Sequence, residues 1–450
     1  MIEKFSDLFA VQGHDRTPVA HQYLCGLVQT ERANMERMEE NVEGMDYQSI
    51  QQFLTDSPWD HRAVMDRVAQ DASELLGGAA PRALLIDETS FIKKGQASAG
   101  VARQWSGRLG KVDNCQVGVF GVLSAGARAL AVDCRLYLPA AWIEDPARCR
   151  KAGIPEAESA RLRTKPELAL EIVRHQRALG VAFEWVGADG LYGNDPAFLR
   201  ALDDDGERFI IDVHADQRVY LEDPCPRAPE PKGRGRKPSR LKAQAEPVRV
   251  DKYVAGLAAE HWQRLSVRAA ENGPLRIDFH RRAVWVWDGA EERARRWQLA
   301  VRRDVPSGQL KYGLSNAGAE VTDLELARAQ AQRFWIERVF EDGKKECGMA
   351  DYQARQWLAW QHHMALVMMV LLFMTRQRMV LAEERPLLTC HDIRCLLAFF
   401  LPRRASGEEE ILRQMEARHR KRLAARRTPR AGLPIPPDAR NGHDSRLDGH

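Results

Sequence analysis

The 450-residue sequence predicts an α/β protein whose sheet domain is interrupted by a β-rich insertion and preceded by helices. Three observations support this class. Short apolar runs bounded by turn residues indicate buried strands, helical patterns alternate with those runs, and a later stretch alternates apolar and polar residues as paired strands do. The length exceeds one ordinary core, so several domains are expected.

The first 78 residues predict helices. Residues 30–42 are charged and periodic, and residues 56–78 open with Asp-Ser-Pro and close with paired glycines. Pro58 would lie in the first helical turn, where proline is tolerated because the N–H it lacks has no partner there. We expect a separate helical N-terminal domain over residues 1–78.

After Pro81 the pattern changes to strands. Three apolar runs form a predicted meander, and a helix, a strand, a second helix and a second strand follow; their ranges are 83–87, 115–125, 127–139, 166–179, 183–189, 196–202 and 208–215. This is the order of an RNase H-like α/β domain. Asp87 and Asp189 end two of the runs. We expect them on neighbouring central strands, because active sites of open sheets collect at strand ends.

The remaining chain divides by composition. A Pro/Gly/Arg-rich connection precedes the period-two stretch, helices resume near Asp323, and a charged tail with prolines is expected to be disordered. The predicted segments are 1–78 (helical), 79–216 (first part of the sheet domain), 217–322 (linker and β-rich insertion), 323–400 (helical second part) and 401–450 (tail).

Composition and charge exclude several classes. No run of about 18 apolar residues occurs, and the longest, Met364 to Met374, predicts a buried helix rather than a membrane span. The N-terminus lacks signal-peptide features, and the eight cysteines match no zinc module, which favours reduced thiols in the cytoplasm. The net charge of +4 conceals two basic segments: residues 227–242 carry seven basic and one acidic side chain, and residues 413–430 carry eight and one. Such segments favour binding to phosphate backbones.

One helical stretch, AQRFWIERVFEDGKKECG, places Arg333, Glu337, Phe340 and Lys344 on a single face. A carboxylate flanked by two cations suits a metal ligand beside a phosphate path. A solvated face with internal ion pairs explains the same spacing, and Glu341, one turn further along, competes with Glu337. The pattern alone leaves these alternatives open.

Asp87, Asp189 and a later glutamate together make a stronger indication than any of them alone. Three converging carboxylates repel one another unless cations bind between them. Oxygen ligands of this kind suit Mg²⁺ or Mn²⁺, and two such ions support in-line phosphoryl displacement. The sequence therefore predicts a two-metal site for phosphoryl transfer.

The chain resembles the DDE transposases of bacterial insertion sequences, in the group whose RNase H-like domain carries a β-rich insert. The resemblance spans roughly residues 20 to 380 and rests on four motifs: TDSPWDHRAVMDRVA, LIDETSFIKKGQASAGVARQWSGRLGKVDNCQVGVF, VGADGLYG and RFWIERVFEDGKKECGMADYQARQWLAWQHHMAL. It implies Asp87, Asp189 and Glu337 as the catalytic and metal-binding set. Arg333 and Lys344 fall on positions that contact DNA phosphates in the family, and the family's tyrosine is replaced by Gln330.

Further DNA contacts are expected with weaker support. Lys93, Lys94, Arg103 and Lys111 follow Asp87 in a glycine-containing stretch, with a solvated loop as the alternative. Arg234, Arg236 and Lys237 lie between glycines like a minor-groove hook, although a flexible linker fits equally well. Trp285, Trp287 and Trp297 are candidates for stacking on a flipped base, and strand pairing is the commoner use of such side chains.

The resemblance implies an enzyme that acts as a homodimer on double-stranded DNA, namely terminal inverted repeats and target DNA, in the bacterial cytoplasm at the nucleoid. Its N-terminal helices would bind the DNA ends. Two alternatives stay open: a transposase-derived DNA-binding regulator that no longer cleaves, and an RNase H-like nuclease without strand transfer.

Overall fold

The computed structural model describes residues 2–78, 81–107, 109–229, 240–270 and 273–427. It confirms a mixed α/β protein with a large sheet. By its internal contacts the chain divides into two units, residues 1–402 and residues 403–450.

The N-terminal region is helical, as the sequence predicts. Its elements are η1 (Ile2–Phe5), α1 (Ser6–Phe9), a short pair of strands β1 (Ala10–Val11) and β2 (His14–Asp15), α2 (Thr17–Gln29), α3 (Met35–Asn41), α4 (Tyr47–Thr55) and α5 (His61–Leu75).

The start predicted for α5 at Asp-Ser-Pro is wrong. The helix begins at His61, and the Asp60 carboxylate accepts a hydrogen bond of 2.8 Å from the Arg62 N–H. The reason is Trp59, which is fully buried and stacks on His362 at 3.8 Å between ring centroids. Residues 57–60 therefore stay outside the helix, since Trp59 must reach the core.

One ten-stranded sheet dominates the molecule, in the order β11-β12-β13-β14-β8-β7-β3-β5-β4 with β6 also paired to β5. Its strands are β3 (Arg82–Ile92), β4 (Ala102–Ser106), β5 (Lys111–Ala125), β6 (Arg128–Leu136), β7 (Trp185–Ala188), β8 (Phe209–Val213), β11 (Gln263–Ala270), β12 (Gly273–Val286), β13 (Arg295–Asp304) and β14 (Leu310–Ser315). The predicted meander corresponds to β3, β5 and β6, whereas β4 and β14 were not predicted. A separate pair joins β9 (Arg218–Val219) to β10 (Val248–Arg249).

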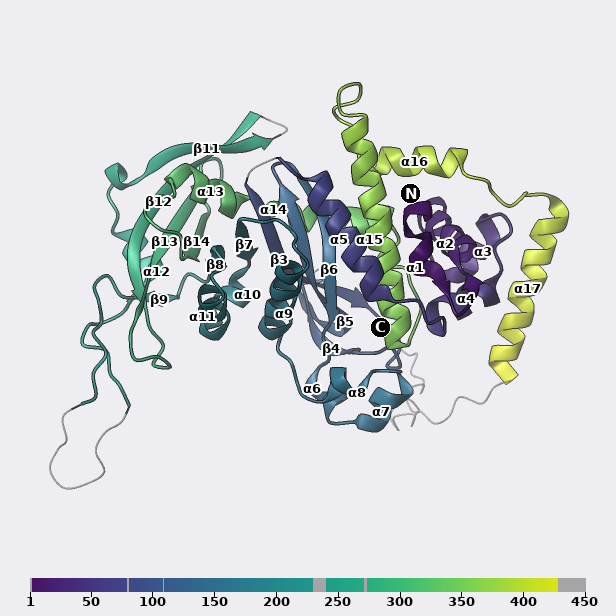
Figure 1. Ribbon diagram of the computed structural model, residues 1–450, viewed down its shortest axis with the longest axis horizontal. Coiled ribbons are helices and arrows are strands. Elements are labelled where there is room, and N and C mark those ends of the chain that lie inside the picture. Colours follow the sequence, from purple (N-terminus) through teal and green to yellow (C-terminus); the bar gives the residue numbers. More distant parts are fainter. Residues whose placement is uncertain (1, 79–80, 108, 230–239, 271–272, 428–450) are drawn as a thin grey trace, which may run out of the picture. The chain divides into compact units, whose positions relative to one another are not determined.

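The period-two stretch does not fold as an isolated sheet. Strand β14 pairs antiparallel with β8, so β11 to β14 continue the central sheet (Figure 1). Side chains on one face of β8 and on the same face of β13 and β14 therefore belong to one continuous surface.

Helices cover both faces of the central strands. Neighbouring residues of β5 show this: a Cβ at Gly121 would touch Ile172 of α9 (Lys165–Ala178), whereas Phe120 packs against Phe340 of α14 (Phe334–Glu346). Because neighbouring strand residues face opposite ways, α9 and α14 lie on opposite faces. The other helices are α6 (Ala140–Ile143), α7 (Pro146–Lys151), α8 (Glu156–Ser159), α10 (Gly190–Gly193), α11 (Pro196–Asp204), α12 (Val250–Ala255), η2 (Ala259–His261), α13 (Asp323–Ala331), α15 (Trp357–Val380), α16 (Cys390–Phe400) and α17 (Glu408–Arg427).

The predicted buried helix is α15. Among the described residues it is the one helix long and apolar enough to cross a membrane. However, 89% of its apolar 18-residue stretch is buried inside the protein. Its two histidines, His362 and His363, are fully buried and hydrogen-bonded, His363 to the Tyr23 hydroxyl at 2.8 Å. It is a core helix by these contacts.

The expectation of a disordered tail is wrong for residues 408–427, which form α17. Three glutamates occupy its first turn, where negative charge interacts favourably with the helix dipole. One of them, Glu410, also forms a salt bridge of 2.7 Å with Arg413. The end of the predicted tail, residues 428–450, lies outside the described residues.

Replacement of Gly193 by alanine tests how α10 is packed on β8. An added Cβ would lie 1.9 Å from the Asp212 carbonyl oxygen, so backbone must move. We expect Gly193→Ala to lower the free energy of unfolding by at least about 2 kcal/mol, measured by guanidinium denaturation. Gly95→Ala is the control, because nothing lies within 4 Å of its added Cβ. Equal stability of both variants would contradict this packing.

Candidate active site

Three aspartates form a row across the centre of the sheet. Strands β3, β7 and β8 are parallel neighbours, with Ile86 opposite Ala188 and Ala188 opposite Ile211. The next residue in each strand's direction is Asp87, Asp189 and Asp212 respectively. Asp87 and Asp189 therefore lie on neighbouring strands as predicted, but the prediction that Asp87 ends its strand is wrong, because β3 continues to Ile92. Asp212 extends the row by one strand.

Asp212 was not predicted as a site residue, although the sequence contains a signal for it. The run Phe-Ile-Ile-Asp at 209–212 has the same apolar-then-aspartate pattern as the runs that end at Asp87 and Asp189. Its partners show that it belongs to the site: the Gln330 amide donates to one of its oxygens at 3.0 Å, and Arg333 Nε donates to the other at 3.2 Å.

Successive side chains of β3 point to opposite faces of the sheet, so its polar residues fall into two groups. Asp87 lies opposite Phe120 and so faces α14. Two residues on, Thr89 faces the same way, and its hydroxyl accepts a hydrogen bond of 2.6 Å from Lys344 Nζ. Glu88 faces the α9 side, where it pairs with Lys165 at 2.8 Å and accepts a hydrogen bond from the Tyr192 hydroxyl at 3.0 Å. Sequence reasoning did not single out Glu88.

Arg333 connects the carboxylates. Its guanidinium lies 3.3 Å from Asp87 Oδ2, 3.2 Å from Asp212 Oδ2 and 3.6 Å from Glu337 Oε1. The predicted continuous helix is interrupted at residues 332–333, between α13 and α14. Arg333 therefore lies at the beginning of α14, and its side chain reaches Asp87 in the middle of β3 and Asp212 near the end of β8.

Burial and electrostatic repulsion raise the pKa values of Asp87 and Asp189. Burial, with a further contribution from the Asp189 carboxylate, raises the pKa of Asp87 to about 7, although Arg333 opposes the shift. Burial also raises the pKa of Asp189, and Glu88 adds to that effect. The two aspartates thus resist carrying full negative charge together without a nearby cation.

The expected convergence of Asp87, Asp189 and Glu337 is not present in this structure. Within the described ranges, no three Asp, Glu, His or Cys side chains lie close enough to hold a metal ion. The Glu337 side chain is 61% exposed, and Arg333 lies between it and Asp87. Glu341 instead pairs at the surface with Arg338 and Lys345, so Glu337 is the glutamate nearer the row.

The donors nevertheless suit a hard divalent cation. Asp87 and Asp189 offer carboxylate oxygens from adjacent strands, and the positive charge they need is supplied here by Arg333. Carboxylate oxygens are the ligands that Mg²⁺ and Mn²⁺ prefer. The row therefore fits such an ion in its chemistry.

The basic residues after Asp87 differ in how they are placed. Lys93 donates to the Tyr352 carbonyl at 2.9 Å and lies 3.4 Å above the Tyr352 ring, and burial lowers its pKa to about 7. The Lys93 ammonium group is therefore used in contacts within the protein, and these contacts disfavour Lys93 as a DNA-binding residue. Lys94 and Arg103 are exposed, and Lys111 is 65% exposed beside Asp113. Arg234, Arg236 and Lys237 lie outside the described residues.

The three tryptophans of the predicted insertion differ in how deeply they are buried and in the contacts they make. Trp297 is 3% exposed, packs edge-on against Phe209 and donates to Asp203, which removes it as a base-stacking candidate. Trp287 donates to the Glu291 carbonyl, and Trp285 pairs its backbone with Tyr220. Both are partly buried.

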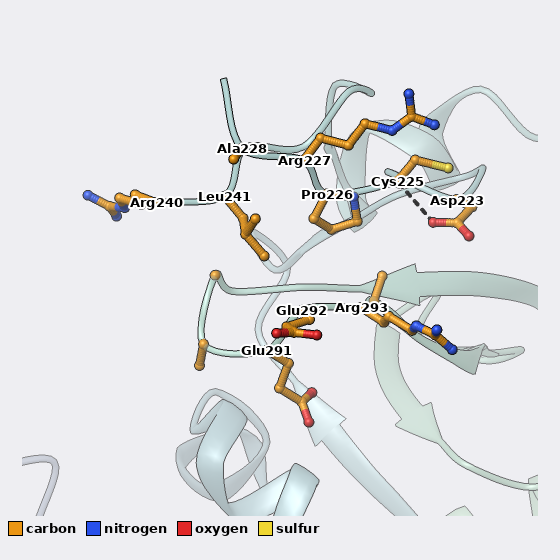
Figure 2. A pocket seen from close by; sticks show the side chains of 13 residues that line it. Asp223, Cys225, Pro226, Arg227, Ala228, Arg240, Leu241, Glu291, Glu292 and Arg293 are labelled. Atoms are coloured by element: carbon orange, nitrogen blue, oxygen red, sulfur yellow. Dashed lines mark hydrogen bonds between the residues drawn. The ribbon is translucent and has the colours of Figure 1, made fainter. Parts of the chain in front are cut away.

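A large pocket lies between the Asp223–Arg227 loop and the turn that joins β12 to β13, but it lacks the chemistry of the aspartate row. Figure 2 shows the Asp223–Arg227 loop opposite the Glu291–Arg293 turn, with Arg240 directed away. Its lining mixes carboxylates and arginines and contains none of the three aspartates.

Comparison with known proteins shows which protein family the chain is similar to. A model of the DDE superfamily endonucleases matches residues 7–274, which include the three aspartates but not Glu337. The chain is 26% identical over 317 residues to a probable transposase for insertion sequence element IS701 of Microchaete diplosiphon, covering 69% of this chain and 70% of that protein. The cryo-EM structure of a piggyBac transposase synaptic complex with hairpin DNA aligns at a TM-score of 0.39 and 9% identity, over 97% of this chain and 84% of that one, too distantly to support an argument.

Replacement of Asp87 by asparagine tests the buried charge. The pKa of Asp87 is raised from an ordinary 3.8 to about 7 in the folded protein. Ionisation therefore destabilises the fold, an effect absent below about pH 4 and complete above about pH 7. We expect Asp87→Asn to exceed the wild type in unfolding free energy by about 2–4 kcal/mol near pH 8, with the difference shrinking towards pH 4.

Denaturant unfolding at several pH values measures this difference. Asp113→Asn is the control with the opposite sign, because the Asn114 N–H lowers the pKa of Asp113 and its loss costs stability at neutral pH. A difference for Asp87→Asn that does not change with pH would contradict the assignment.

Proposed function

Because the chain belongs to the DDE superfamily of endonucleases, we propose that this DDE-type transposase cleaves the ends of a mobile DNA element and joins them to target DNA. The observation that carries the proposal is the row of Asp87, Asp189 and Asp212 on adjacent parallel strands, with Arg333 bound to it. The expected DNA partners are terminal inverted repeats and target DNA, bound by a homodimer in the bacterial cytoplasm.

The strand order supports an RNase H-like catalytic domain with a β-rich insertion. An antiparallel β3, β5 and β6 followed by parallel β7 and β8 places Asp87 centrally, with helices on both faces. Strands β11 to β14 would be the insertion, and α13 to α15 the second part of the domain. The helices up to α5 would bind the DNA ends.

The site chemistry supports phosphoryl transfer. Asp87 and Asp189 would hold Mg²⁺ or Mn²⁺, and Glu337 would complete the set by turning its exposed carboxylate inward. Such ions, as a pair, activate the attacking oxygen and stabilise the leaving one. Arg333 and Lys344 reach β3 from the same face of α14. They lie where a phosphate approaching Asp87 would meet positive charge, and they would orient it.

The central test is a Mg²⁺-dependent cleavage and strand-transfer assay with the inverted repeats read from DNA flanking the gene. We expect Asp87→Ala, Asp189→Ala and Glu337→Ala each to lower the cleavage rate at least about 100-fold. Glu341→Gln is the control, because that carboxylate pairs only with surface cations among the described residues. Full activity in any of the three alanine variants would remove that residue from the set. Cleavage without joined products would instead indicate a nuclease.

Asp212 is expected to position Arg333 rather than to act on the substrate. Its replacement by asparagine keeps the shape but removes the charge that holds the guanidinium at 3.2 Å. We expect Asp212→Asn to lower strand transfer by about 10–100-fold, less than the loss of Asp87, as for other residues that orient a site. The ratio of the two rates in one assay checks this. A variant as active as the wild type would contradict the positioning role.

A further inference from the structure

A cationic cavity adjoins the aspartate row on the α14 side. It measures about 220 Å³ and is lined by the sheet on one side and by the α13–α14 junction on the other. Its charged lining consists of Arg268, Arg302, Lys311, Arg333, Asp212, Asp304 and Glu337. A water molecule takes about 30 Å³ in the liquid, so the cavity has room for a solvated phosphate group.

The strand register explains why cations gather here. Arg302 of β13 lies directly opposite Lys311 of β14, and Gly313 of β14 lies directly opposite Asp212 of β8. Opposite residues and residues two apart share a sheet face. Lys311 and Arg302 therefore continue, on the same face, the row that begins with the aspartates.

This arrangement costs folding free energy. Like charges directly opposite on antiparallel strands are destabilising. Burial lowers the pKa of Arg302, and burial together with the charge of Arg302 lowers the pKa of Lys311. Neither side chain forms a salt bridge or hydrogen bond with the residues that the structure describes; Asp212 and Asp304 act on Arg302 only through longer-range attraction.

Other parts of the lining favour an anion as the ligand. Asp304 already accepts hydrogen bonds from Ser307, and Asp212 is held by Gln330 and Arg333, so these two carboxylates have other partners. Glu337 attracts Lys311 without a salt bridge to it within the described residues. The first turn of α14 contributes Phe334 to the lining, and the N–H groups of Trp335 and Ile336 donate to the carbonyls of Gln332 and Arg333. The cationic side chains, rather than the helix terminus, are therefore the groups available to an anion.

We propose that Arg302 and Lys311 bind a backbone phosphate of the DNA strand whose neighbouring phosphodiester lies at the aspartate row. The inference rests on the proposed function and adds a binding subsite on β13 and β14. Because the subsite lies on the same sheet face as the row, a strand bound there is aligned with the carboxylates before reaction.

The test compares Arg302→Met, Lys311→Met and the double variant with the wild type. Methionine keeps an unbranched apolar stem, so packing is retained while charge is removed. Binding of a fluorescent DNA duplex, measured by anisotropy over a range of NaCl concentrations, gives affinity and salt dependence. We expect each single variant to bind about tenfold more weakly, with the slope of log K against log salt reduced by about 1 per lost contact.

The matched control is Arg303→Met. Arg303 is the next residue on β13 and faces the other way, where it pairs with Asp278 at 3.0 Å. It should leave the salt slope unchanged. Slopes equal to the wild type in both Arg302→Met and Lys311→Met would overturn the subsite.

Thermal unfolding without DNA separates a binding role from a structural one. Removal of one of two opposed like charges should raise Tm by about 1–3 °C. A lower Tm with unchanged DNA binding would show that these charges serve the fold, and would overturn the proposal.

A second probe, inorganic phosphate, separates failure of this inference from failure of the proposed function. If the wild type binds no duplex, the proposed function fails. The subsite then still predicts that phosphate raises the Tm of the wild type more than chloride does at equal ionic strength, and that the double variant loses this difference. No difference between the two proteins in phosphate would overturn the subsite. Stabilisation by phosphate without duplex binding would overturn DNA as its ligand.

Discussion

Burial and mutual repulsion of the aspartates carried by or directly following β3, β7 and β8 are the constraint on which the site depends. Asp87, Asp189 and Asp212 follow residues paired in register, so the sheet itself brings them side by side. Such a row is stable only if protons or cations reduce its charge. In this structure Arg333 does so by bridging Asp87 and Asp212, and the pKa of Asp87 is raised to about 7. A divalent cation would meet the same electrostatic demand.

The helix break before α14 places Arg333 where it meets this demand. A continuous helix would carry Arg333 in its interior, but the turn at residues 332–333 places it at the beginning of α14, in reach of two strands. The rest of that helix face then lies along β3, with Lys344 on Thr89 and Phe340 on Phe120. Glu337 lies 3.6 Å from Arg333 with its side chain 61% exposed.

The continuity of the sheet extends the site beyond its carboxylates. Because β14 pairs with β8, the insertion shares a face with the catalytic strands, and its cations lie next to the acidic row. Acidic groups of the aspartate row and basic groups of the β13–β14 strands thus share one sheet face, although burial of either set alone lowers folding stability. Proteins often accept such a cost in stability where a ligand is bound.

The sequence by itself determined most of the local elements and the placement of Asp87 and Asp189 after apolar runs of strands, because a four-residue apolar run followed by aspartate can be recognised without knowledge of tertiary contacts. The roles of Gln330, Asp212 and Glu88 were not predicted, because each depends on a partner more than one hundred residues away along the chain. Tertiary structure alone decided that Lys93 is used in the interior, that Trp297 belongs to the core, and that β14 joins β8. These outcomes depend on which strands pair and in what register, and register is fixed by packing across the whole sheet rather than by any single segment.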